Sequence, residues 1–113
     1  MLVLKDSTVN PDRLKPELLL ALIIADQIYS RAGHSELVIT SLNDAQHKPN
    51  SLHYEGLAAD IRTWGVDGEA TAQMIHSKLN SRYQVLFEGD HIHIEYDPPE
   101  HSHTTVYDPT LIQ

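Results

Sequence analysis

An aspartate stands within an otherwise apolar run of residues, and it restricts the possible folds more than any other residue of the chain. Asp60 lies inside segment 56–63, where apolar residues alternate as they do in a β-strand. A carboxylate at such a position is costly to bury unless it is paired with a cation or bound to a metal ion. A salt bridge, for instance to Arg62 or Arg31, would satisfy Asp60, and so would a metal.

The remaining pattern predicts a small domain built around that strand. The expected elements are a helix from Pro16 to about Gly33, strands at 37–40 and 56–63, a helix of about 13 residues from Asp67 to about Arg82, and strands at 83–88 and 91–96. Gly89 and Asp90 indicate a hairpin turn between the last two strands. This order of elements favours an α+β fold with a small, mainly antiparallel sheet and helices packed on it. Residues 1–15 are expected to form an N-terminal arm and residues 97–113 an irregular tail.

Helical spacing also predicts which side chains face the core. In the first helix these are Leu18, Leu19, Leu22, Ile23, Ala25 and Ile28. In the second they are Met74, Ile75 and Leu79. Trp64 is expected in the core or at its rim.

Size and charge exclude several classes of protein. The 113 residues are predicted to form one domain, 1–113. With 16 acidic residues against 8 Lys and Arg, the net charge of −8 disfavours binding to nucleic acid or to an anionic membrane. There is no cysteine, so any zinc must be held by histidine and carboxylate.

The sequence gives no sign of a targeting segment. Its start lacks the apolar core of a signal peptide, and no apolar run approaches the roughly 20 residues of a membrane span. We therefore expect a soluble protein, either cytoplasmic or released by a phage-type route.

Two histidines in the last predicted strand are candidate zinc ligands. His91 and His93 are two residues apart, so both side chains point to one face of the sheet. Together with His53 and Asp60, either of them would complete the three protein ligands of a catalytic zinc, which leaves one position for water. Residue chemistry alone does not choose between His91 and His93, and an exposed strand face also tolerates histidines that bind nothing.

Two acidic residues flank the histidine pair. Glu95 is two residues beyond His93 on the same strand face and is expected to orient a histidine. Asp90 could accept the proton of a metal-activated water, provided that the chain turns or bulges at Gly89. Strict alternation would otherwise place Asp90 on the opposite face.

Taken together, these residues form a longer pattern. The pattern is Ser51-x-His53-x-x-Gly56-x-Ala58-x-Asp60, followed by Asp90-x-x-His93. Over about residues 36–96 the chain closely resembles the zinc D-alanyl-D-alanine carboxypeptidase and L-alanyl-D-glutamate endopeptidase family. The amino-terminal signalling domain of Hedgehog proteins shares the fold of that family.

The resemblance implies a role for each residue of the pattern. His53, Asp60 and His93 would bind zinc, Asp90 would be the general base, and His91 would line the site and steady the oxyanion. The implied reaction is hydrolysis of an amide bond in a peptidoglycan stem peptide. The Hedgehog relationship also allows an alternative function, a catalytically silent zinc-binding structural or assembly domain.

Substrate contacts are less well defined. Ser51 would hydrogen-bond in the site or to substrate, and Tyr54, next to a candidate ligand, is a candidate substrate contact. Many relatives carry an arginine shortly after the strand that precedes the first motif, but segment 40–44 here reads TSLND. Lys48, Arg62, Arg31 or His47 could take its place.

Overall fold

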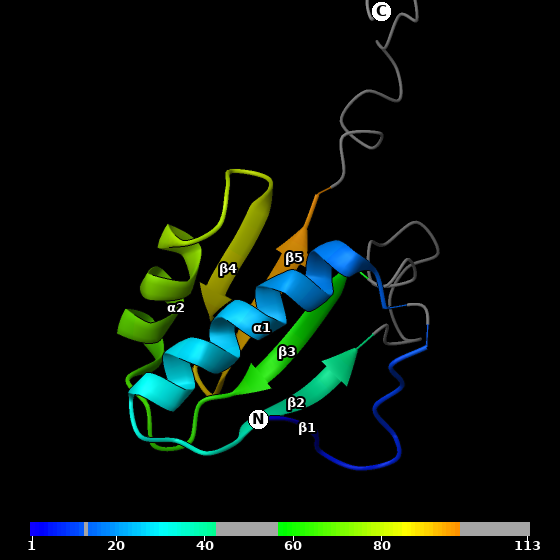
Figure 1. The fold of residues 1–113 in the computed structure, drawn as a ribbon, viewed down its shortest axis with the longest axis horizontal. Helices are drawn as coiled ribbons and strands as arrows, with labels where there is room; N and C mark the ends of the chain where they lie inside the picture. Colours follow the sequence, from blue (N-terminus) through cyan, green and yellow to red (C-terminus); the bar gives the residue numbers. More distant parts are fainter. Residues whose placement is uncertain (13, 43–56, 98–113) are drawn as a thin grey trace, which may run out of the picture.

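The strands form one mixed sheet in the spatial order β1-β2-β3-β5-β4 (Figure 1). The computed structural model describes residues 1–12, 14–42 and 57–97. Its strands are β1 (Leu2–Leu4), β2 (Leu37–Leu42), β3 (Ala58–Arg62), β4 (Tyr83–Phe87) and β5 (His91–Tyr96), and its helices are α1 (Pro16–Arg31) and α2 (Gly68–Ser77). The β2–β3, β3–β5 and β4–β5 pairs are antiparallel, which confirms the predicted α+β class and the mainly antiparallel sheet.

The first strand was not predicted. Residues 1–15 were expected to be an arm, but Leu2–Leu4 pairs in parallel with the start of β2. Three apolar residues are too few to show a period, so only the neighbouring strand reveals this element. The backbone N–H of Lys5 continues the contact by donating to the Ile39 carbonyl oxygen at 2.9 Å.

Helix α1 follows its predicted boundaries. Pro16 and Glu17 occupy its first turn, and Gly33, with a φ of 94°, follows its C-terminal end. Its predicted apolar face was too wide, because Leu19 and Ile23 are 41% and 43% exposed. The stripe that packs on the sheet is Leu18, Ala21, Leu22, Ala25, Ile28 and Tyr29.

Helix α2 is shorter than predicted. The Asp67 side chain accepts a hydrogen bond from the backbone N–H of Ala70 at 3.1 Å, which confirms the predicted N-cap. The helix ends at Ser77, and the Asn80 side chain then accepts from the backbone N–H of Arg82 at 2.8 Å, forming a local turn before β4. Met74 is 50% exposed rather than in the core, because the inward stripe of this short helix is formed by its buried Ala72 and Ile75.

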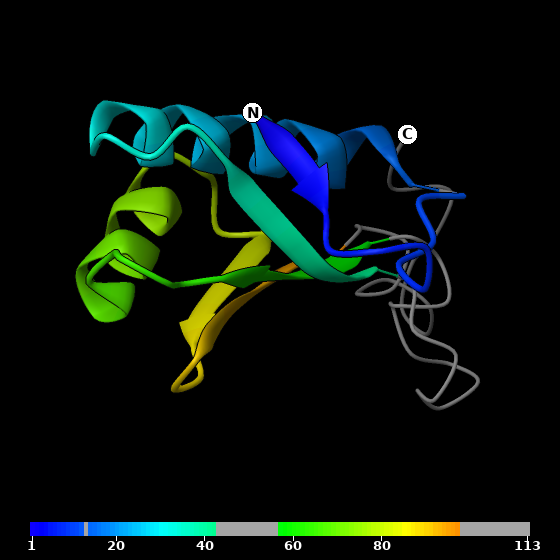
Figure 2. The same cartoon turned by 90° about the horizontal axis from the view of Figure 1, so that it is seen from below.

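Both helices lie on the same side of the sheet (Figure 2). On that side the fully buried large side chains are Leu18, Leu22, Leu37, Leu42, Ile61, Ile75, Ile92 and Ile94. Within β5 the buried Ile92 and Ile94 alternate with the partly exposed His91, His93 and Glu95. The two histidines therefore lie on the face opposite the helices, as the alternation predicts.

No helix in the described part of the chain is both long and apolar enough to cross a membrane. The predicted irregular tail lies outside the described residues from position 98 onward.

Candidate metal centre

The β3–β5 ladder brings Asp60 and His93 together. Asp60 is the register partner of His93, and Arg62 is the partner of His91. Directly opposed residues on antiparallel strands have Cβ atoms about 5 Å apart, so their side chains can touch. The Asp60 Oδ1 atom lies 2.8 Å from His93 Nδ1, and these side chains are 22% and 14% exposed.

Glu95 holds the other side of the His93 ring. Its Oε1 atom lies 3.0 Å from His93 Nε2, the partnership expected from its place two residues along the strand. The pKa of His93 is raised to about 10, chiefly by the hydrogen bond with Asp60 and then by the one with Glu95, against the effect of burial. A metal ion would displace the proton from this ring, because a ligating imidazole is neutral.

His91 is also enclosed by carboxylates. Its Nδ1 atom lies 2.6 Å from Asp90 Oδ1, its Nε2 atom 3.0 Å from Glu88 Oε1, and the same Nε2 atom 4.0 Å from Asp60 Oδ1. The hydrogen bond with Asp90 is the largest cause that raises the pKa of His91, and the same bond lowers the pKa of Asp90.

The turn at Gly89 explains how Asp90 reaches His91. Gly89 has a φ of 95°, and the backbone N–H of Glu88 donates to the His91 carbonyl oxygen at 2.8 Å, closing the hairpin. The turn leaves the Asp90 side chain 88% exposed while its carboxylate contacts the His91 ring. The chain therefore does turn at Gly89, which is the condition under which Asp90 could lie beside the histidine pair.

Glu88 is a site residue that the sequence analysis missed. One ligand atom each from Asp60, Glu88 and His91 lie within 4.8 Å of one another, close enough for a metal ion. The signal was available: residues that flank a two-residue hairpin turn are cross-strand neighbours, so a Gly89-Asp90 turn places Glu88 beside His91.

The structure tests the alternative of an arginine partner for Asp60. Within the described residues, the ion-pair partners of Asp60 are His91 and His93. The Arg62 guanidinium carbon instead lies 3.8 Å from the centre of the Trp64 ring. A salt bridge to Arg62 therefore does not explain the carboxylate in this strand.

The described donor atoms are imidazole nitrogens and carboxylate oxygens, which are among the atoms that bind zinc. Two ligands of one tetrahedral zinc ion lie about 3.3 Å apart, given bonds of about 2.0 Å to nitrogen and oxygen. The Asp60–His93 distance of 2.8 Å is close to that value, and it is also the distance of a hydrogen bond between the two groups. His53, Ser51 and Tyr54 lie outside the described residues, so the predicted third ligand and the predicted substrate contacts stay predictions.

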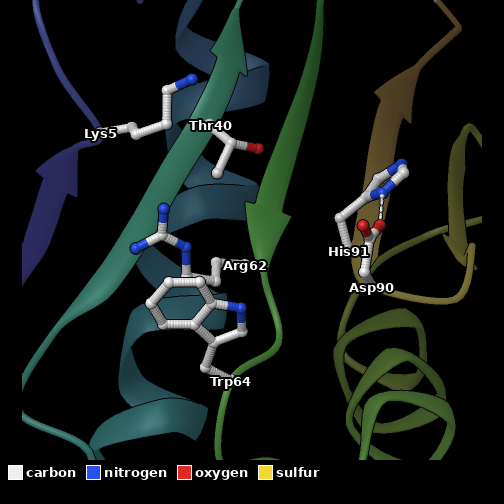
Figure 3. Close-up of a pocket in the computed structure, with 6 residues that line it drawn as sticks. All are labelled: Lys5, Thr40, Arg62, Trp64, Asp90 and His91. Atoms are coloured by element: carbon white, nitrogen blue, oxygen red, sulfur yellow. Dashed lines mark hydrogen bonds and ion pairs between the residues drawn. The ribbon is translucent and has the colours of Figure 1, made fainter.

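A hollow of about 260 Å³ adjoins His91 on this face of the sheet (Figure 3). The residues that line it are Lys5, Thr40, Arg62, Trp64, Asp90 and His91. Lys5 and Thr40 have no predicted role, because it is the β1–β2 and β2–β3 pairings that bring them near β5. Trp64 is 72% exposed and therefore belongs to the rim rather than the core.

The chain matches none of the known protein-family models and none of the curated proteins with which it was compared.

Proposed function

We propose that this protein is a zinc-dependent hydrolase of an amide bond in peptidoglycan stem peptides, with a fold of the Hedgehog and D-alanyl-D-alanine peptidase type. The observation that supports it most is the contact between Asp60 and His93 at 2.8 Å on the sheet face opposite the helices. The motif residues Asp60 and His93 are 33 positions apart in sequence, yet they are paired in space. The hydrolase is of the D-alanyl-D-alanine carboxypeptidase type or the L-alanyl-D-glutamate endopeptidase type.

In this proposal Asp60 and His93 are zinc ligands and His53 supplies the third. Bound zinc would act as a Lewis acid toward the substrate carbonyl and lower the pKa of a water molecule. Glu95 would keep the His93 ring in its ligating orientation.

Asp90 and His91 would act on the reacting groups as a pair. The lowered pKa of Asp90 keeps its carboxylate ionised, as a proton acceptor must be. The raised pKa of His91 favours the imidazolium, which could stabilise negative charge on the substrate carbonyl oxygen. Asp90 would then pass the accepted proton to the leaving amine.

A second candidate function is a catalytically silent zinc-binding structural or assembly domain of the same fold. One observation favours it: the Asp90 side chain is 88% exposed and its carboxylate is engaged with the His91 ring. If Asp90 only holds the His91 ring in place, the metal centre lacks a general base and does not catalyse hydrolysis.

The deciding experiment combines metal analysis with peptide hydrolysis. Protein purified without a histidine tag should contain about one zinc per chain and release an amino acid or peptide from synthetic stem peptides. Asp90→Ala should keep the zinc and lose the hydrolysis, while Glu69→Ala on the exposed surface of α2 should keep both.

Each outcome has a clear reading. Zinc without hydrolysis in the unmodified protein would favour the silent domain. Protein that takes up no zinc would refute both candidates.

A further inference from the structure

Two cationic side chains and an exposed aromatic ring surround the hollow next to His91. Arg62 and Lys5 line it together with Thr40 and Trp64, in front of the strands and on the side away from α1 (Figure 3). The Arg62 guanidinium stacks on Trp64, with 3.8 Å from its central carbon to the ring centre. Tryptophan and arginine are both enriched among the residues that contribute most to binding at interfaces.

Arg62 has no anionic partner among the described residues. Within 1–12, 14–42 and 57–97, no carboxylate lies within ion-pair distance of its guanidinium. Lys5 has one distant contact, 3.8 Å to the exposed Asp6. The acidic residue of the hollow, Asp90, is engaged with His91. Within the described part of the chain, the donors of Arg62 are thus open to an anion, and those of Lys5 are engaged through the contact with Asp6.

The position of Arg62 limits what that anion can be. Arg62 is two residues from Asp60 along β3, which is a rise of about 7 Å. An extended peptide covers about 3.3–3.6 Å per residue, so this distance corresponds to one or two residues of a bound substrate. The hollow of about 260 Å³ is too small for a long peptide but large enough for a carboxylate with a small side chain.

We infer that Arg62, Lys5 and Thr40 form a subsite for a main-chain carboxylate that the substrate carries one or two residues beyond the scissile bond on its amine side. This inference rests on the proposed function, and it names the part of the substrate that the site selects. Arg62 would form a two-pronged charge-assisted contact with the carboxylate, and Lys5 would add a second charge. The Thr40 hydroxyl, which donates to the Asp60 carbonyl oxygen at 3.4 Å, would turn to donate to the carboxylate instead. Arg62 thereby takes the place of the arginine that segment 40–44 lacks.

Two substrates carry such a carboxylate. One is a peptide ending in D-alanyl-D-alanine, where it is the C-terminal group. The other is L-alanyl-D-glutamate linked through the glutamate side chain, where the main-chain carboxyl group stays free.

Trp64 gives the test a direct readout, because it is the single tryptophan of the chain. Binding is followed by Trp64 fluorescence in metal-free and zinc-loaded protein. The probes are N-acetyl-D-alanyl-D-alanine and L-alanyl-D-glutamate with its side-chain carboxyl amidated. Each is compared with the matching compound in which the main-chain carboxylate is amidated as well. At least one acid should bind about 10- to 100-fold more tightly than its amide, the factor for loss of one charge-assisted contact. The peptide that shows this difference identifies the substrate.

Variants separate the subsite from the metal centre. Arg62→Gln should abolish the preference for acid over amide, Lys5→Gln should reduce it, and Lys78→Gln at the end of α2 should leave it unchanged. Lys5 is exposed in a segment after β1, so its variant keeps the test valid if Arg62→Gln does not fold. Equal binding of acid and amide, no binding of either, or a full preference in both Arg62→Gln and Lys5→Gln would overturn the inference.

The failure of the subsite and the failure of the proposed function are distinguishable. A carboxylate preference without hydrolysis in zinc-loaded protein would leave the subsite intact and refute the enzyme. Hydrolysis of acid and amide with equal KM would refute the subsite and leave the proposed enzyme intact.

Discussion

Asp60 and His93 meet across the β3–β5 ladder, with 2.8 Å between Oδ1 and Nδ1. The contact depends on strand register, because a shift of one residue would turn either side chain to the opposite face of the sheet. The buried Ile61, Ile92 and Ile94 fix that register from the other face. The hydrophobic core thus sets the geometry of the candidate metal centre.

Removing either partner of this contact should abolish zinc binding. We expect Asp60→Asn and His93→Gln each to lower zinc affinity by more than about 100-fold, and Glu95→Gln by about 10-fold, because it only orients a ligand. Competition against a fluorescent chelator measures these affinities. His76→Gln, at an exposed position of α2, is the control and should bind zinc like the unmodified protein. Unchanged affinity in Asp60→Asn would exclude Asp60 as a ligand.

The metal-free protein should lose stability as the pH rises. The pKa of His93 is raised from 6.5 to about 10 by Asp60 and Glu95, so the folded state holds a proton that the unfolded state has released in that range. The resulting stabilisation, on the order of 2 kcal/mol, is fully present below pH 6.5 and is lost as the pH approaches 10. Urea unfolding in the presence of a chelator measures it.

The same experiment on a variant assigns the effect. In His93→Gln the fall in stability between these pH values should become shallower, with a remainder from His91, whose pKa is also raised. Deprotonation of Tyr29 does not confuse the result, because burial raises the pKa of its phenol to about 12. A stability curve identical in slope to that of the unmodified protein would contradict the assignment.

Asp90 should control the titration of His91. The hydrogen bond from His91 Nδ1 to Asp90 is the largest cause of the raised pKa of His91, so Asp90→Asn should lower that pKa toward 6.5. Asp60 and Glu88 still raise it in the variant, so the fall is partial. NMR titration of the imidazole protons in metal-free protein measures this shift. Glu69→Gln is the charge-matched control, and an unchanged His91 titration in Asp90→Asn would show that the pair does not form in solution.

Gly89 should be needed for the hairpin that carries these residues. Its φ of 95° is strained for residues with a side chain, although a Cβ there would meet no atom within 4 Å. Gly89→Ala should therefore destabilise the fold by about 1 kcal/mol, a purely backbone effect, and lower Tm by about 4 °C. Gly89→Asn should cost less, because asparagine tolerates positive φ better than alanine. Equal melting temperatures for the glycine and alanine forms would refute this account of the turn.

Elements with a clear apolar period could be predicted from the residue pattern alone. The alternation at 91–96 predicted a strand with both histidines on one face, the Asp67 cap and Gly33 located helix ends, and the position of Glu95 predicted its contact with His93. These features depend on residues close together in the chain. Local spacing and turn chemistry are sufficient to predict them.

Residue chemistry left open which distant residues meet, and the packing of the fold settles it. It placed Asp60 against His93 rather than Arg62, and it added β1, whose three residues carry no period of their own. It also set Lys5 and Arg62 around one hollow beside His91. Register across β1, β2, β3 and β5 is fixed by core packing between segments far apart in sequence, and no local pattern contains that information.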